Sequence, residues 1–261
     1  MKRLYLIPDR QNLRESMQLA KENEASFEYN DFFMGAVLDD KKKQLEIIDE
    51  YAKVRSDFST DTMHGAFLDV TVHSTDARIR EVSELRVRQS MDIAKEMGLY
   101  GVVFHTNRLQ GFRETEYLKN WQKANECFFR RICEEYSNQQ IFMENMFDEA
   151  PDVLQEFAER MTDVDNFGIC LDYAHAIVSD TEAVDWMRML SPAVKHMHIN
   201  DNDLKNDLHL PVGMGQIDWK QFAEEMEISH IESSVLVEVT GVEKQKVSIK
   251  YMKENGIYPF A

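Results

Sequence analysis

Short runs of apolar and β-branched residues alternate along this chain with longer stretches in which apolar residues recur every three or four positions. The short runs predict β-strands, and the longer stretches, such as 77–97 and 115–136, predict amphipathic helices. The candidate strands are RLYLIP (3–8), SFEYN (26–30), FSTDTMH (58–64), GVVFH (101–105), IFMEN (141–145), FGICLD (167–172), VKHMHI (194–199) and VLVEV (235–239). Because strand and helix follow one another eight times, we predict an α/β fold of the closed (β/α)8 type, a TIM barrel.

The length of the chain agrees with one such barrel. It has 261 residues, of which 43% are hydrophobic and 30% charged, enough to build one substantial core. No linker rich in Pro, Gly or Ser divides it, and no G-x-G-x-x-G turn follows the first strand, as a doubly wound dinucleotide-binding sheet would require. We therefore predict a single domain over residues 1–261.

Charge and cysteine content exclude several classes of protein. The 30 Lys and Arg residues face 47 Asp and Glu, a formal net charge of −17, which disfavours nucleic acid as a partner. The apolar stretch in the opening segment MKRLYLIPDRQ is too short for a signal peptide, and no apolar run reaches membrane-spanning length. We therefore expect a cytoplasmic protein without a membrane partner. Cys127, Cys133 and Cys170 lack C-x-x-C spacing, which favours buried reduced thiols over disulfides or a thiolate zinc site.

Acids and histidines close six consecutive candidate strands. They are His64, His105, Glu144, Asp172, His198 and Glu238. In a TIM barrel the carboxyl ends of the strands carry the reactive groups. Each residue alone fits an ordinary solvated strand end or a core histidine. Together, carboxylates on neighbouring inward-facing strands would repel one another, and a divalent cation would remove that repulsion. The pattern therefore predicts a metal site.

Further candidate ligands follow these strand ends. His175 lies three residues after Asp172, and Asp207 and His209 are two residues apart in the loop after the seventh strand. That loop continues as HLPVGMGQIDW, where Gly213 and Gly215 permit a tight turn over the site. Oxygen and imidazole ligands without thiolate favour Zn, Mn, Co or Fe in an open, catalytic site.

The segments FHTN, MENM, CLDYAHA, HMHINDND, DLHLPVGMGQIDW and LVEVTG resemble, in order and spacing, the xylose isomerase-like superfamily, which contains sugar phosphate isomerases and epimerases and endonuclease IV. The resemblance covers residues 60–240. By resemblance to its epimerases, Glu144, Asp172, His198 and Glu238 would hold one divalent metal (Zn, Mn or Co). Glu144 and Glu238 would also transfer protons through a metal-bound enediolate, and His175 would contact substrate oxygens.

The ligands of endonuclease IV, which uses three zinc ions, correspond to a larger set. It comprises His64, His105, Glu144, Asp172, His175, His198, Asp207, His209 and Glu238, so up to three metals and phosphodiester hydrolysis at abasic sites are the alternative. The loops PDRQN and MFDEAPD, and the Thr-Asn after His105, depart from the nuclease pattern. We therefore predict a metal-dependent isomerase or epimerase of a sugar or sugar phosphate. A noncatalytic, metal-containing sugar-binding barrel is a further alternative, and the sequence indicates no oligomeric state.

Other unusual residues are predicted to be structural. His196 shares a strand face with His198 and is expected one layer deeper in the barrel, hydrogen-bonded. Arg86 and the other arginines of 78–88 alternate with glutamates and predict a solvated helix face. Phe112 and Phe147, in loops after the fourth and fifth strands, are possible walls for a sugar ring.

Overall fold

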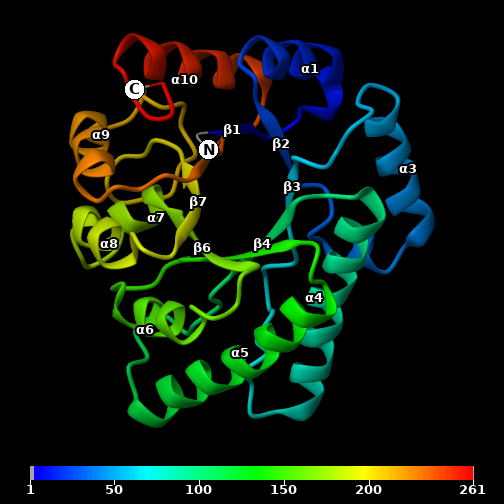
Figure 1. The fold of residues 1–261 in the computed structure, drawn as a ribbon, viewed down its shortest axis with the longest axis vertical. Helices are drawn as coiled ribbons and strands as arrows, with labels where there is room; N and C mark the ends of the chain where they lie inside the picture. The colour runs from blue at the N-terminus through cyan, green and yellow to red at the C-terminus, as the bar shows by residue number, and fades with distance from the viewer. Residues whose placement is uncertain (1–2, 261) are drawn as a thin grey trace.

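Eight parallel strands form a closed ring in the computed structural model, which describes residues 3–260 (Figure 1). Each strand pairs with the next, and β1 pairs with β8 to close the barrel. The strands are β1 (Arg3–Leu6), β2 (Ser26–Tyr29), β3 (Thr62–His64), β4 (Gly101–His105), β5 (Gln140–Glu144), β6 (Phe167–Asp172), β7 (Val194–Ile199) and β8 (Ser234–Val237). The predicted single-domain TIM barrel is confirmed.

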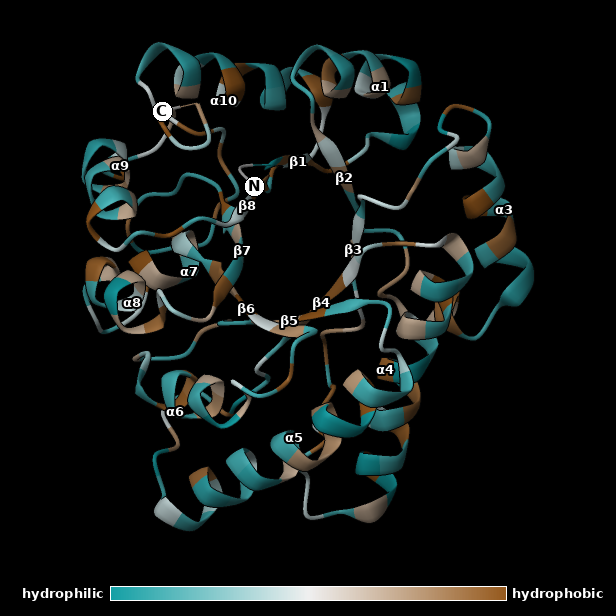
Figure 2. Ribbon diagram, in the orientation of Figure 1, coloured by the Kyte–Doolittle hydropathy of each residue, from teal (hydrophilic) through white to brown (hydrophobic). Residues whose placement is uncertain are grey.

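Helices surround the ring of strands, with hydrophilic and hydrophobic residues side by side along the longer ones, such as α4, α5 and α10 (Figures 1 and 2). They are η1 (Arg10–Asn12), α1 (Leu13–Glu22), α2 (Gly35–Leu38), α3 (Lys41–Ala52), α4 (Ala77–Met97), α5 (Thr115–Glu135), α6 (Asp152–Arg160), α7 (Tyr173–Ile177), α8 (Ala183–Leu190), α9 (Trp219–Ile228) and α10 (Val242–Glu254). In α5, Trp121, Phe128 and Ile132 are buried and share the main core with the outer faces of the strands. Burial of this apolar stripe is what holds the helix against the barrel.

The third strand is shorter than its sequence predicted. Only Thr62–His64 pairs, because Phe58–Asp61 forms a turn in which the Asp61 amide donates to the Phe58 carbonyl at 2.9 Å. The Asp61 carboxylate accepts hydrogen bonds from the Phe27 amide (3.0 Å) and the Tyr29 hydroxyl (2.9 Å). This buried acid therefore anchors the start of β3 to β2. The polar residues of the predicted strand gave no indication of this role.

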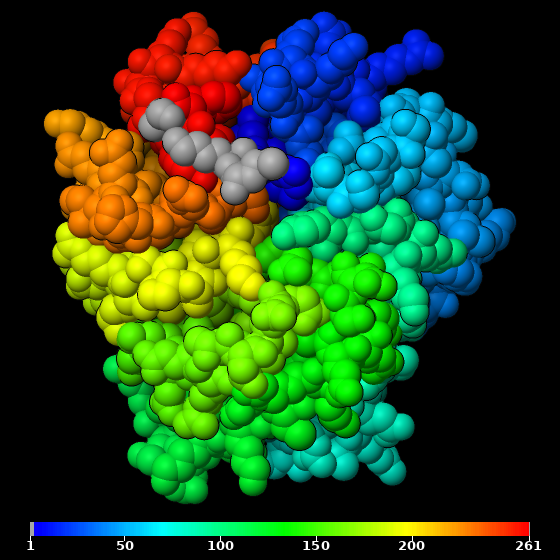
Figure 3. Space-filling view, viewed as in Figure 1, coloured from blue at the N-terminus to red at the C-terminus, as the bar shows by residue number. Residues whose placement is uncertain are grey.

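Buried side chains on the inward faces of the strands fill the inside of the ring. Figure 3 shows the outside of the molecule, where the segments of the chain pack side by side. Val103, Phe142 and Cys170 form one buried apolar cluster, and Tyr5, Ile7 and Leu236 form another. Both belong to the inward faces of strands, because side chains alternate in direction along a strand.

Two smaller predictions can also be compared with the structure. Cys133 and Cys170 are buried as expected, but Cys127 is exposed, because it lies on the outer face of α5. Within residues 3–260, the structure contains no helix that combines the length and the apolar character needed to cross a membrane.

A candidate metal centre at the carboxyl end of the barrel

Four of the predicted ligands converge where the strands end. Glu144 closes β5, Asp172 closes β6, His198 lies on β7 and Glu238 directly follows β8. One possible ligand atom from each of the four lies within 4.8 Å of the others. All four residues are buried. The parallel register explains the convergence, since it pairs Asp172 with His198 on neighbouring strands.

The arrangement leaves buried polar atoms without partners. His198 Nδ1 lies 3.3 Å from Glu144 Oε1 and 3.7 Å from Glu238 Oε2. Both carboxylate oxygens of Glu144, Asp172 Oδ2, Glu238 Oε2 and His198 Nδ1 are buried without a hydrogen-bond partner. An unpartnered buried polar atom costs about 1–3 kcal/mol, and more if charged. Oxygen and imidazole donors of this kind suit a divalent cation, so the residues fit the metal that the sequence predicts.

The carboxylates of the cluster differ in their protonation. Burial, and then the neighbouring carboxylates Glu238 and Glu144, raise the pKa of Asp172 to about 8, although His175 acts in the opposite direction. Burial would also raise the pKa of Glu144, but the imidazoles of His198 and His105 outweigh it and hold that pKa well below its ordinary value. The imidazoles thus favour the ionised form of Glu144, whereas burial and the neighbouring carboxylates favour the neutral form of Asp172.

A second group shares Glu144 from its other side. His64 Nε2 and His105 Nε2 lie 3.5 Å and 3.2 Å from Glu144 Oε2, and 3.1 Å from each other. His64 Nδ1 lies 3.0 Å from the Gly65 carbonyl and donates to it, which leaves the Nε2 lone pair directed at this group. Phe67, which the sequence did not single out, packs against both rings at centroid distances of 5.1 and 4.9 Å. His64, His105 and Glu144 could together hold a second cation.

The remaining candidates, His175, Asp207 and His209, are neighbours without equal convergence. Asp207 Oδ2 lies 3.4 Å from His175 Nε2 and 3.0 Å from His209 Nε2. Within the described chain, their ligand atoms do not gather inside 4.8 Å as those of the other two groups do. His209 has a left-handed backbone (φ 46°). Burial lowers the pKa of its imidazole, but Asp207 and Glu238 together raise that pKa to about 10.

The sequence analysis missed Glu28, a fully buried acid in the middle of β2. Its Oε2 accepts a hydrogen bond from the Thr62 hydroxyl at 2.7 Å and lies 3.1 Å from His196 Nε2. His196 Nδ1 is 2.6 Å from Ser234 Oγ, so His196 is the buried, hydrogen-bonded layer that the sequence predicted below His198. The sequence signal that could have identified Glu28 is its position as a charged residue between Phe27 and Tyr29 in a short strand.

The glycine-rich loop after β7 is anchored by a second missed residue, Asp201. Its carboxylate accepts hydrogen bonds from the Gly213 amide (2.8 Å), the Ile217 amide (3.1 Å) and Trp219 Nε1 (2.8 Å). A Cβ at Gly215 would come within 2.3 Å of Asp201 Oδ1, too close for any side chain. The expected tight turn is present, with Gly213 at φ 85° and the Met214 amide donating to the Pro211 carbonyl at 2.9 Å, and the two glycines also permit close packing on Asp201 and on Tyr251 of α10.

The predicted aromatic walls differ from each other. The Phe147 ring lies 5.0 Å from that of His175 and is 41% exposed, so it borders the site. Phe112 instead packs against Tyr117 of α5 at 5.2 Å. The helix face around Arg86 is partly solvated, as predicted, and Arg86 also pairs with Asp39, which the sequence did not predict.

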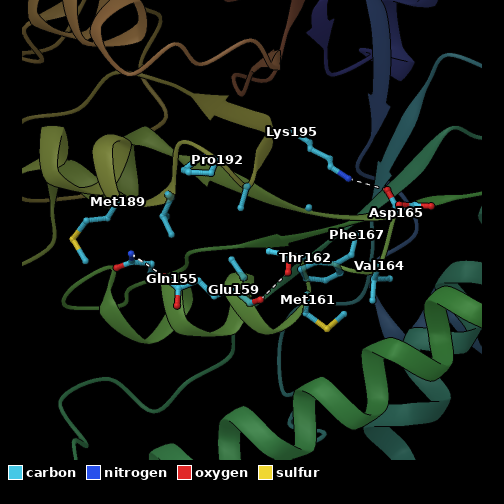
Figure 4. A pocket seen from close by; sticks show the side chains of 14 residues that line it. Gln155, Glu159, Met161, Thr162, Val164, Asp165, Phe167, Met189, Pro192 and Lys195 are labelled. Atoms are coloured by element: carbon cyan, nitrogen blue, oxygen red, sulfur yellow. Dashed lines mark hydrogen bonds between the residues drawn. The ribbon is translucent and has the colours of Figure 1, made fainter.

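A pocket of about 270 Å³ lies at the opposite end of the strands, between α6 and α8 (Figure 4). Phe167 and Gly168 at the start of β6 and Lys195 near the start of β7 contribute to its lining, and Lys195 Nζ donates to the Asp165 carbonyl at 2.9 Å. No imidazole lines it, and its acids do not converge on one point as those at the mouth do. The candidate ligands therefore converge at the carboxyl end and not at this pocket.

Comparisons with known proteins agree with the geometry. The sequence model of a family described as Xylose isomerase-like TIM barrel matches residues 18–255. An uncharacterised protein of Methanocaldococcus jannaschii, MJ1614, is 24% identical over 204 residues, 74% of this chain and 76% of its own.

Solved structures with the same fold include several proteins named for sugar chemistry or solved with zinc. The TTHB071 protein of Thermus thermophilus, from a crystal soaked with ZnCl2, has a TM-score of 0.75 at 20% identity and covers 97% of both chains. A D-tagatose 3-epimerase-like protein has a TM-score of 0.73 at 22% identity and covers 98% of this chain and 97% of its own. The IOLI protein with a bound zinc atom has a TM-score of 0.70 at 16% identity and covers 98% of both. At these identities the likeness shows the fold.

Proposed function

Because the chain belongs to the xylose isomerase-like TIM-barrel family, we propose that it is a divalent-metal-dependent isomerase or epimerase of a small sugar. The observation that carries this proposal is the convergence of Glu144, Asp172, His198 and Glu238, with buried oxygens that lack partners. These four residues would hold Zn, Mn or Co. The bound cation would polarise a substrate carbonyl and make the neighbouring C–H bond more acidic.

Glu144 and Glu238 are the proposed proton-transfer pair. They come from β5 and from the end of β8, which are three strands apart in the ring, so they reach a substrate at the mouth from different sides. One carboxylate would remove the proton from the carbon next to the carbonyl, and the other would return a proton to the opposite face. His175, whose Nδ1 donates to the Asn145 carbonyl at 2.8 Å, would contact the substrate oxygens through its other ring edge.

The charges around the mouth favour a free sugar over a sugar phosphate. Arg108, in the loop after β4, has a side chain only 1% exposed. Its guanidinium pairs with Asp148 at 2.9 Å and with Glu149, so its charge is already matched. A phosphate at this loop would meet two carboxylates and no available cation from Arg108.

Exchange in heavy water tests the proposal. Protein loaded with Mn, Co or Zn is incubated with a panel of ketoses and ketose phosphates, and deuterium at the carbon beside the carbonyl is measured together with epimer formation. We expect both with at least one free ketose and neither with Glu144→Gln. Thermal stabilisation by a sugar without exchange or epimer would identify a noncatalytic binding barrel instead.

A second candidate function is phosphodiester hydrolysis of the endonuclease IV kind, favoured by the His64, His105 and Glu144 group beside the first. It requires two or three metals per chain and nicking of abasic duplex DNA that is lost on His105→Ala. The net charge of −17 and the matched charge of Arg108 oppose DNA binding. One bound metal with no nicking at low salt would eliminate this candidate.

A further inference from the structure

We infer that Glu28 is a positioning residue that fixes the ring and the tautomer of His198, so that Nδ1 of His198 faces the metal centre. Glu28 Oε1 lies 3.0 Å from His198 Nε2, on the side of the ring away from the ligand cluster, as a close charge contact whose angle is not that of a hydrogen bond. Both residues are fully buried. The inference rests on the metal centre of the proposed function, and is independent of the reaction and of the substrate.

The two ring nitrogens of His198 have different surroundings. Nδ1 lies 3.3 Å from Glu144 and 3.7 Å from Glu238, whereas Nε2 faces Glu28. A neutral imidazole has one N–H, and a carboxylate can only accept a hydrogen bond. A proton on Nε2 is stabilised by the negative charge of Glu28, 3.0 Å away, and leaves the Nδ1 lone pair for a cation. Metal-binding histidines are commonly oriented in this way by a carboxylate on the other nitrogen.

Glu28 is itself held on its other oxygen. The Thr62 hydroxyl donates to Oε2 at 2.7 Å, and His196 Nε2 lies 3.1 Å from the same atom. His196 is fixed in turn by Ser234 Oγ at 2.6 Å from its Nδ1. Because Oε2 is engaged on two sides, Oε1 stays directed at His198. Glu28 thus connects β2, β3 and β7 to one imidazole across the inside of the barrel.

The alternative is that Glu28 only stabilises two buried histidines. In that case, replacing it would change the stability of the fold and leave the metal affinity of the folded protein unchanged. Glu28→Gln separates the two roles, because it keeps the shape and some hydrogen bonds but removes the charge that selects the Nε2–H tautomer.

The test measures the binding of Zn²⁺ and Co²⁺ alone, by competition with a chelator, and the visible absorption of the Co²⁺-loaded protein. For Glu28→Gln we expect about 10- to 100-fold weaker binding and a shifted Co²⁺ spectrum, with the fold retained. The control is Glu225→Gln on α9, a buried glutamate that pairs with Arg188 at 2.7 Å and also accepts from Ser229, neither of which belongs to the cluster. It should bind both metals as the parent protein does.

Nitrogen NMR of the parent protein gives an answer even if the variant fails to fold. In the Zn²⁺-loaded protein we expect the proton of His198 on Nε2 and metal coordination at Nδ1. An unchanged affinity and Co²⁺ spectrum in a folded Glu28→Gln protein, or a Zn²⁺-loaded protein with the proton of His198 on Nδ1, would overturn the inference, as would a parent protein that binds neither metal. If the parent binds metal and Glu28→Gln binds it weakly, but no sugar is converted, the proposed function fails and the inference stands.

Discussion

The two ends of the barrel bury different kinds of side chain. At the carboxyl end, Glu144, Asp172 and His198 are almost completely buried, with oxygens and nitrogens that find no hydrogen-bond partner. At the amino end, the pocket between α6 and α8 has a largely apolar lining, and Lys195 donates to a carbonyl there. Unpartnered buried acids cost stability, so a fold keeps them only where another benefit offsets that cost. The contrast assigns chemistry to one end and packing to the other.

The largest expected effect comes from Glu144→Gln at the carboxyl end. Glu144 lies between His198 on one side and His64 and His105 on the other, so its charge serves every part of the cluster. We expect exchange activity to fall by about 10²–10⁴-fold. The variant should stay folded, because glutamine keeps the size of the side chain and removes a charge whose burial costs stability. Glu159→Gln, a matched change beside the pocket at the amino end, should leave activity unchanged. Comparable losses in both variants would remove the distinction between the two ends.

The second largest effect is expected from metal binding at the carboxyl end, which should raise the stability of the folded protein. With a cation at 100 times its dissociation constant, the free energy of unfolding should rise by about 2.7 kcal/mol. For a chain of this size that corresponds to roughly 5–10 °C in melting temperature. Calorimetry before and after addition of Zn²⁺ measures the shift, which should disappear in Glu144→Gln and persist in Glu159→Gln. An equal shift in both variants would place the cation elsewhere.

A smaller effect is expected at His73, an imidazole buried outside the cluster, beside Tyr117 and Trp121. Burial lowers its pKa to about 4, whereas the unfolded chain should protonate it near its ordinary value of 6.5. The unfolded state therefore binds the proton first as pH falls, and stability is lost from pH 6.5 downwards. Between pH 6.5 and 5 the contribution is about 2 kcal/mol.

Denaturant unfolding of His73→Gln at several pH values measures this contribution. The variant should lose less stability on acidification than the parent over that interval. Identical pH dependence in the two proteins would show that His73 is protonated equally in both states.

The smallest effect is expected at the amino end itself, from Lys195→Met. The ammonium group makes one hydrogen bond, to the Asp165 carbonyl, and the side chain borders an apolar pocket. We expect a change of at most about 1 kcal/mol in the free energy of unfolding, with metal affinity as in the parent. A loss of metal binding would show that the two ends are coupled.

The barrel and the cluster were predictable from sequence for a physical reason. In parallel strands of a closed barrel, the residues that end each strand must meet at one mouth, so the positions of Glu144 and Asp172 follow from their place after apolar runs. The resemblance to a known family, and not the spacing, supplied the assignment of four ligands to one metal. The contacts inside the barrel were harder to predict from the sequence. Glu28 and Asp201 act through partners far away in the sequence, such as His198 and Trp219, and no local pattern identifies such pairs.

Anomalous X-ray scattering from a crystal of this protein soaked with Zn²⁺ would locate the cation. We expect a peak among the carboxylates of Glu144, Asp172 and Glu238 and Nδ1 of His198, which disappears in crystals of Glu144→Gln. A map without density among those four side chains, in protein that binds Zn²⁺ at another place or not at all, would contradict the proposed metal centre.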